Sequence, residues 1–246
     1  MSNIVSAATS SVGKKVITGL TGIALGLFVI VHLAGNLTLF LGEHGKAFNE
    51  YAHLLESMGH GWLLPVAEIS LVALFVAHIA AAVSVSLRKR EARPVGYYNS
   101  GDAGHTSKKT PSSQSMIYSG IVLLAFLLLH IWQFRIANLS NTAHYPTAEV
   151  RDLYRIVYGA FQSPLNVGIY VVVMLFLGLH LRHGLWSAWQ SLGLNNRRVM
   201  PVLFSAAVLI SILLAVGFLS IPVYLHFNGA PPAEALNATA LEGGHP

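Results

Sequence analysis

The sequence predicts an all-α integral membrane protein with five transmembrane helices. Of its 246 residues, 54% are hydrophobic and only 10% are charged, whereas a soluble domain carries about 25% charged residues. Five runs contain almost no charge, and each reaches the roughly 20 residues that a helix needs to cross a bilayer. A helix is expected because it satisfies its own backbone hydrogen bonds in lipid.

The five helices are expected to form one membrane domain that covers residues 1–246. Their expected ranges are 15–41, 62–88, 114–137, 164–190 and 201–227. The first run is too long for the apolar core of a signal peptide and lacks a clean cleavage site, so it is kept as a helix. The connection 88–113 is rich in Gly, Ser, Pro and charge, which predicts irregular structure. The tail after Phe227 is rich in Ala, Pro and Gly and is expected to be flexible.

Two shorter helices are predicted along one surface of the membrane. The first external loop contains "KAFNEYAHLLESMG", which has helical spacing. The third connection contains "PTAEVRDLYRIVYGAFQSP", where Pro146 and Thr147 indicate a helix start and Glu149 falls in the first turn.

The positions of the basic residues predict the orientation of the chain. Eleven of the 15 Lys and Arg residues lie at the start of the first helix, near the ends of the second and fourth helices, or in the connections that follow those two. The other four lie in the first and third connections or at the end of the third helix. By the positive-inside rule, the N-terminus is cytoplasmic and the C-terminus lies outside.

Cysteine is absent from the sequence. Its absence excludes disulfides, thiolate metal sites, iron–sulfur clusters held by this chain and covalently attached c-type haem. A chain of this kind that handles electrons must use a noncovalent cofactor and receive the electrons from another subunit.

Four helices carry a histidine deep in their apolar run: His32, His78, His130 and His180. Each lies 14–16 residues from the start of its run, which is about 22 Å into a core of about 30 Å. Because the helices alternate in direction, His32 and His130 (the outer pair) share one depth. His78 and His180 (the inner pair) share another, about 15 Å away.

Two histidines that face each other across a four-helix bundle are the axial ligands that a b-type haem needs. The pattern therefore predicts a four-helix bundle that encloses two stacked haems, with these four histidines bound to the haem irons. Small residues near the histidines could leave room for a flat macrocycle, although close helix packing explains them equally well. They are Gly19, Gly22, Gly26, Gly120, Gly178 and Gly184.

Two other interpretations of the histidines stay open. A single intramembrane histidine can serve an interhelical hydrogen bond, but four at matched depths on four helices make that explanation weak. A proton relay would place titratable groups at graded depths, whereas these form two layers.

The motif "HLRH" places His183 three residues after His180. The two side chains lie on nearby helix faces, but His183 is about 4.5 Å nearer the cytoplasm, so a haem propionate or water is its expected partner. Other cations near that face could also meet propionates, although positive-inside topology alone explains most of them. The candidates for propionate contacts are Lys14, Lys15, Arg88, Lys89, Arg182 and His183, with Lys15, Arg88 and His183 preferred.

Four motifs resemble the cytochrome b subunit of succinate dehydrogenase and fumarate reductase, in its bacterial form with one five-helix anchor and two haems. They are "GIALGLFVIVHLAGN", "FVAHIAAAVSVSLRKRE", "LLLHIWQFR" and "LGLHLRHGLWSAWQSLGL". The resemblance implies that His32 and His130 bind the outer haem and that His78 and His180 bind the inner haem. Some members carry a glutamate where this chain has Gly178, so their proton path is not expected here.

The resemblance further implies an electron-transfer subunit of succinate:quinone oxidoreductase in the cytoplasmic membrane of a bacterium. Its partners would be a flavoprotein with FAD and an iron–sulfur protein, and the whole complex could form a higher oligomer. The subunit itself would do no chemistry on succinate and would pass electrons to a membrane quinone. Proton donors near the outer haem suggest the quinone site, with the cytoplasmic end as the alternative. They are Glu43, Glu50, His53 and Glu68.

Rival functions make distinct predictions. A dihaem cytochrome b of another dehydrogenase, such as a hydrogenase or formate dehydrogenase, would share the haem layers but differ in its partner. A transporter or channel that uses intramembrane histidines would bind no haem. For Glu68, a hydrogen bond or snorkelling toward the interface is the plainer alternative to proton transfer.

Overall fold

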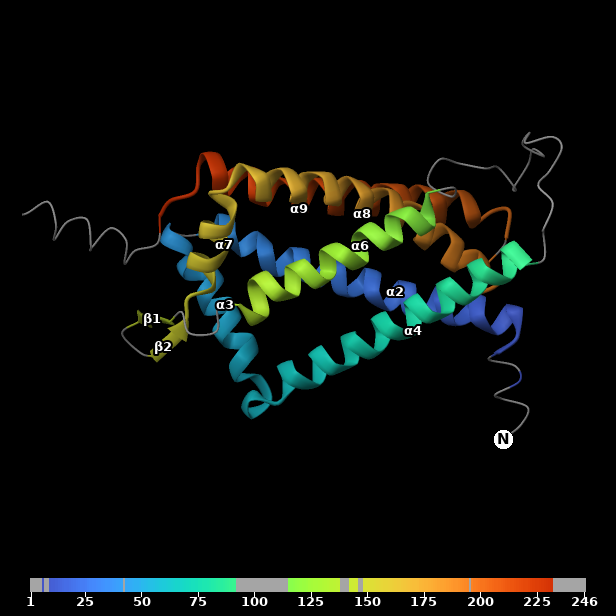
Figure 1. Ribbon diagram of the computed structural model, residues 1–246, viewed down its shortest axis with the longest axis horizontal. Coiled ribbons are helices and arrows are strands. Elements are labelled where there is room, and N and C mark those ends of the chain that lie inside the picture. The colour runs from blue at the N-terminus through green and yellow to red at the C-terminus, as the bar shows by residue number, and fades with distance from the viewer. Residues whose placement is uncertain are drawn as a thin grey trace, which may run out of the picture. The chain divides into compact units, whose positions relative to one another are not determined.

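The computed structural model describes residues 6, 9–41, 43–91, 115–137, 142–145, 148–194 and 196–231, with the backbone alone at 43, 89–91, 142–145 and 148–150. Five long helices carry the apolar runs (Figure 1). They are α2 (Ser11–Asn36), α4 (Leu63–Glu91), α6 (Met116–Ile131), α8 (Pro164–Ser191) and α9 (Met200–Phe227). Together with the turns that extend α2 and α6, each is long and apolar enough to cross a membrane. The predicted class of helical, multi-pass membrane protein is therefore confirmed.

The spans agree with the predicted ranges to within four residues at every end. Helices α2 and α6 are each continued by a short turn of a different helix type. A 3₁₀ turn, Leu37–Phe40, follows α2, and a π-helical turn, Trp132–Ile136, follows α6. π-Helical turns are frequent at functional sites, and this one begins two residues after His130.

The helix predicted in the loop after the first span is confirmed as α3 (Lys46–Ser57). Its Tyr51 ring packs against Gly35 of α2, where a Cβ atom would stand only 2.6 Å from the ring. Gly45 precedes α3 with φ +77°, a left-handed conformation that favours glycine. The Tyr154 ring occupies the space where a side chain at Gly45 would lie.

The third connection differs from the prediction of a helix that starts at Pro146. Residues Ala148–Arg151 form strand β2, which pairs antiparallel with β1 (Thr142–Tyr145), and helix α7 runs only from Leu153 to Phe161. The reason is the N-cap: an Asp152 carboxylate oxygen accepts from the Arg155 backbone N–H at 3.0 Å, and aspartate is among the strongest N-cap residues. Glu149 consequently lies in a strand rather than in a first helical turn.

A buried polar contact joins α3 to α7. Asn49 and Asp152 are 1% and 4% exposed, and the Asn49 side-chain N–H donates to the Asp152 carboxylate at 2.9 Å. The Asn49 side-chain oxygen accepts from the Tyr154 backbone N–H at 2.8 Å. Both polar side chains are therefore satisfied within the fold, which burial requires.

The chain divides into two compact units, and each long helix contributes residues to both. The first unit comprises Met1–Val29, Ala67–Gly120 and Gly178–Ile212, and the second comprises Ile30–Val66, Ile121–Leu177 and Leu213–Pro246. The inner pair, His78 and His180, falls in the first unit, and the outer pair, His32 and His130, falls in the second. The single membrane domain of 1–246 stays a prediction. The expectations for residues 92–114 and for the tail from residue 232 lie outside the described residues.

Candidate functional site

The outer pair brings two imidazole rings together in the second unit. The ring centres of His32 on α2 and His130 on α6 are 5.9 Å apart, with an angle of 87° between the ring planes. Metal–imidazole bonds are about 2 Å long, so two rings on opposite sides of one metal ion have centres about 6 Å apart. The separation therefore suits two axial ligands of one iron.

Aromatic side chains surround the outer pair. Phe126 and Phe134 lie 5.6 and 5.1 Å from the His130 ring, and Phe218 of α9 lies 5.8 Å from the His32 ring. These apolar walls exclude water from the rings and favour the neutral imidazole that haem iron binds.

Tyr170 of α8 defines which nitrogen of His130 carries the proton. Its hydroxyl group donates to the Gln133 side-chain oxygen at 2.9 Å and lies 3.3 Å from His130 Nδ1. A tyrosine hydroxyl has one proton to donate, so it accepts from Nδ1–H of His130. The Nε2 atom of His130 then keeps the lone pair that a metal ligand needs.

Asn36 is the polar neighbour of His32. Its side-chain N–H donates to the His32 backbone carbonyl at 2.8 Å and lies 3.4 Å from His32 Nε2. The two residues are four apart in α2, so they share a helix face.

In the first unit, the same hydroxyl arrangement recurs at His78 of α4. The Thr21 hydroxyl group donates to the Ile17 carbonyl at 2.7 Å and lies 3.1 Å from His78 Nδ1. It therefore accepts from Nδ1–H of His78. The next residue, Gly22, faces the ring so closely that a Cβ atom would stand 3.2 Å from His78 Cε1.

His180 of α8 has an equivalent environment. The Ser119 hydroxyl group donates to the Met116 carbonyl at 3.0 Å and lies 3.0 Å from His180 Nδ1, so it too accepts from the ring. Gly120 follows, and a Cβ atom there would lie 3.7 Å from His180 Cε1. His78 and His183 are both electrostatic neighbours of His180, which places the inner pair in one neighbourhood.

The donor set fits a b-type haem. In the tautomer that the hydroxyl contacts favour, three histidines present Nε2 lone pairs. The two histidines of each pair come from different helices. Within the described residues, no group of three or more His, Cys, Asp or Glu side chains could hold a bare metal ion. Haem iron needs only axial ligands from the protein, because the macrocycle supplies the others.

Four of the six glycines predicted near the histidines divide into two groups. Gly22 and Gly120 face imidazole rings, as described above. Gly19 faces the Ala188 backbone and Gly26 faces the Leu185 side chain, each with a Cβ distance of 3.5 Å. For Gly19 and Gly26, close packing of α2 against α8 is the observed role.

The basic residues predicted to contact haem propionates have different neighbours in the first unit. Lys15 is exposed, whereas the neighbouring Lys14 donates from Nζ to the Ser84 hydroxyl at 2.5 Å. Arg88 donates to the Ser11 hydroxyl at 3.4 Å. The Arg182 guanidinium lies 5.8 Å from the centre of the Phe204 ring. The Lys89 side chain lies outside the described part.

The predicted quinone-site residues are not brought together within one unit. Glu50 and His53 lie on α3 in the second unit, where Glu50 forms an exposed ion pair with Lys46 at 3.8 Å. Glu68 lies on α4 in the first unit and is half-buried. The backbone of Glu43 is described, but its side chain is not. The quinone site therefore stays a prediction.

The hydroxyl residues Thr21, Ser119 and Tyr170 were missed by the sequence reasoning. A signal exists for two of them, because Thr21–Gly22 and Ser119–Gly120 repeat a hydroxyl–glycine pair on the first and third spans. In each pair the hydroxyl group meets Nδ1 of a histidine and the glycine meets Cε1 of the same ring. No comparable local pair marks Tyr170.

Comparisons with known proteins support the resemblance seen in the motifs. No family model matches the chain, and no solved structure matches it significantly. A curated protein, the succinate dehydrogenase cytochrome b558 subunit of Bacillus subtilis (strain 168), is 27% identical over 165 residues, which are 67% of this chain and 71% of the relative. The resemblance to the cytochrome b subunits of succinate dehydrogenase is therefore confirmed by a relative aligned over most of the chain.

Proposed function

We propose that the chain is the membrane-anchoring cytochrome b subunit of a bacterial succinate:quinone oxidoreductase and relays electrons through two bis-histidine b-type haems. The observation that carries the proposal is that each compact unit contains one pair of histidines. The similarity to a succinate dehydrogenase cytochrome b558 subunit supports it. His32 and His130 hold one haem, and His78 and His180 hold the other.

A b-type haem supplies a one-electron iron couple when it is bound in each site. The chain itself holds the imidazoles in place, keeps Nε2 of at least three of them unprotonated and surrounds them with apolar side chains. The hydroxyl groups of Thr21, Ser119 and Tyr170 keep Nε2 unprotonated because each accepts a hydrogen bond from Nδ1–H.

The partners follow from the same proposal. A chain without cysteine cannot hold an iron–sulfur cluster by thiolates, so an iron–sulfur subunit delivers the electrons and a flavoprotein subunit with FAD oxidises succinate. A membrane quinone accepts the electrons. The basic N-terminus and the basic ends of the second and fourth spans support a cytoplasmic position for these partners.

Haem propionates and the quinone would contact the remaining candidates. Lys15, Arg88 and His183 are proposed to lie near propionates. Lys14, which is half-buried and precedes Lys15 in α2, is a further candidate for a propionate contact. Glu43, Glu50, His53 and Glu68 are retained as the proposed proton donors of a quinone site.

The proposal is tested on the complex purified from its own membrane through a tag on this chain. We expect a reduced-minus-oxidised spectrum of b-type haem with about two haems per chain, together with a flavoprotein and an iron–sulfur protein in equal amounts. No haem band, or about one haem per chain, would contradict the dihaem proposal. If the complex contains two haems but its partner is a hydrogenase or formate dehydrogenase, the chain is instead the cytochrome b subunit of that enzyme.

A further inference from the structure

Three hydroxyl groups each face one histidine, and all three use their only proton elsewhere. We propose that Ser119, Thr21 and Tyr170 are positioning residues that hold His180, His78 and His130 in the Nδ1–H tautomer and thereby tune the two haem irons separately. The proposal rests on the proposed function, because it concerns haem ligands.

Ser119 provides the clearest case. The residue is fully buried, and its hydroxyl group donates to the Met116 carbonyl three residues earlier in α6. With that proton committed, the oxygen can only accept from His180, at 3.0 Å from Nδ1. If Nδ1 were the unprotonated nitrogen, the Ser119 hydroxyl group would have to donate to it and would lose its hydrogen bond to the Met116 carbonyl.

His78 has two hydrogen-bond partners on α2. The Thr21 hydroxyl group donates to the Ile17 carbonyl and accepts from His78. The backbone carbonyl of Thr18, one turn earlier, also interacts with the ring as a hydrogen-bond partner. The Thr18 carbonyl can only accept, so the ring keeps one acceptor when the Thr21 hydroxyl group is removed. For this reason, loss of the Thr21 hydroxyl group alone should have a smaller effect than loss of the Ser119 hydroxyl group.

His130 uses a phenol in place of an aliphatic hydroxyl group. The Tyr170 hydroxyl group accepts from His130 and donates to Gln133, which lies in the π-helical turn. The contact is longer, at 3.3 Å, and a phenol is a weaker acceptor than an aliphatic alcohol. The inner pair therefore has two hydroxyl acceptors, whereas the outer pair has one phenol.

The expected consequence is a change of redox potential. An acceptor on Nδ1–H makes the imidazole a stronger electron donor to the iron. Stronger donation stabilises the ferric state, so the haem becomes harder to reduce. Removal of the acceptor should raise the potential of that haem alone.

The test is a potentiometric titration of both haems in the purified complex. We expect Ser119→Ala to raise the reduced-to-oxidised ratio of one haem about threefold to tenfold at a fixed potential, where tenfold corresponds to 59 mV for one electron. Ser119→Thr should restore the original titration because it keeps the hydroxyl group. Tyr170→Phe should move the other haem and leave the first unchanged.

Ser211→Ala is the matched control. Ser211 is 2% exposed, also donates to a carbonyl three residues earlier, at 2.8 Å, and lies in the same unit. Its variant should keep both titration waves in place.

The outcomes separate this inference from the proposed function. If the parent complex contains two haems but Ser119→Ala leaves both waves unchanged, the inference is overturned and the proposed function stands. The inference also fails if Ser119→Ala and Tyr170→Phe move the same wave, or if Ser211→Ala acts as Ser119→Ala does. Should Ser119→Ala lose one haem while Ser119→Thr and Ser211→Ala keep both, the positioning role is supported. Absence of haem from the parent complex would contradict the proposed function itself.

Discussion

The two histidine pairs have different kinds of support. The inner pair is held by small residues: a hydroxyl group and a glycine on α2 face His78, and a hydroxyl group and a glycine on α6 face His180. The outer pair lies among aromatic rings from α6, α8 and α9. The inner site should therefore be sensitive to added volume, whereas the outer site should be sensitive to changes in the side chains that brace its aromatic rings.

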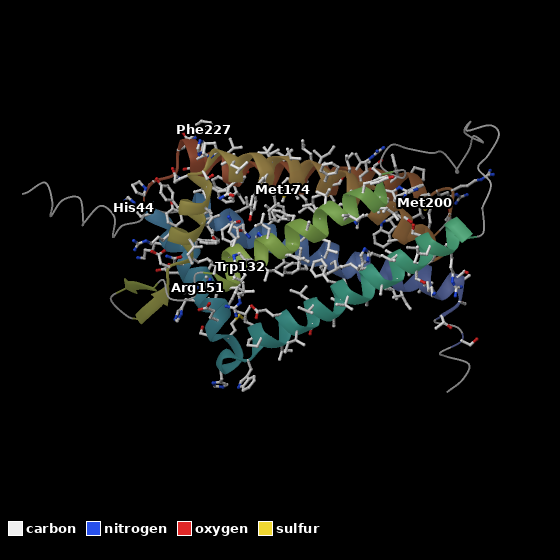
Figure 2. All side chains as sticks on the ribbon, in the orientation of Figure 1. His44, Trp132, Arg151, Met174, Met200 and Phe227 are labelled. Atoms are coloured by element: carbon white, nitrogen blue, oxygen red, sulfur yellow. The ribbon has the colours of Figure 1, made fainter. Side chains whose placement is uncertain are left out.

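The bracing of the outer site extends beyond the spans. Phe161 of α7 packs 4.8 Å from the Tyr170 ring and 6.1 Å from the Phe134 ring. The Arg151 side chain donates to the Phe134 carbonyl at 2.7 Å, and Figure 2 labels Arg151 together with Trp132, where the π-helical turn begins. Surface elements of the second unit thus contact the residues that contact His130.

The largest expected effect that separates the two sites comes from Gly22→Val. A Cβ atom added at Gly22 would lie only 3.2 Å from His78 Cε1, so the two methyl groups of valine must displace the ring. Overpacking of this kind costs about 1–3 kcal/mol. We expect the inner haem to be lost and the outer haem to be retained, as measured by haem content and by the remaining titration wave.

Gly159→Val serves as the control for Gly22→Val. Gly159 is exposed on α7, and a Cβ atom there meets nothing within 4 Å. Its variant should keep both haems. Equal loss of both haems in Gly22→Val would show that the glycine supports the whole bundle and not the His78 ring.

A smaller effect is expected from Asp152→Ala in the second unit. The substitution removes the N-cap of α7 and the partner of the buried Asn49 side chain, which together should lower stability by about 1–2 kcal/mol. We expect the outer haem to dissociate at a lower temperature in detergent, while the inner haem keeps its parent value. Glu50→Gln, at an exposed ion pair, is the control and should change stability by less than about 0.5 kcal/mol. A shift of both haems together would contradict separate support.

The smallest expected effect is a loss of stability at alkaline pH that depends on Tyr154. Burial, with Tyr158, Tyr224 and Asp152 nearby, raises the pKa of Tyr154 from 10.0 to about 12. Because the unfolded chain releases this proton first, stability from Tyr154 is complete below pH 10 and declines as the pH rises from about 10 toward 12. Thermal midpoints measured from pH 9 to pH 11 should fall less steeply in Tyr154→Phe. Identical slopes would rule out this contribution.

The spans and the four histidines were predictable because their signals are local. Apolar runs of about 20 residues define the helices, and the depth of each histidine follows from its distance along its own helix. The assignment of His32 with His130, and of His78 with His180, then required only the alternation of helix direction. In the structure the two members of a pair lie in the same compact unit, and the two pairs lie in different units.

Other features depend on contacts that no local pattern records. Thr21 meets His78 across 57 residues, and Ser119 meets His180 across 61. Lys14 and Lys15 are adjacent, so the sequence could not tell which one faces Ser84 of α4. The strand at Ala148–Arg151 was missed because a Pro–Thr helix start was preferred to the stronger Asp152 cap.

The most direct test of the two-pair account is the haem content of His180→Gln and His130→Gln, with His226→Gln as the control. His226 lies at the end of α9, where its Nδ1 is 2.9 Å from the Phe161 carbonyl. The account predicts that each of the first two variants lowers the content from about two haems per chain to about one, that different titration waves disappear, and that the double variant binds none. Removal of the same wave by both variants, or retention of both haems by either one, would contradict it.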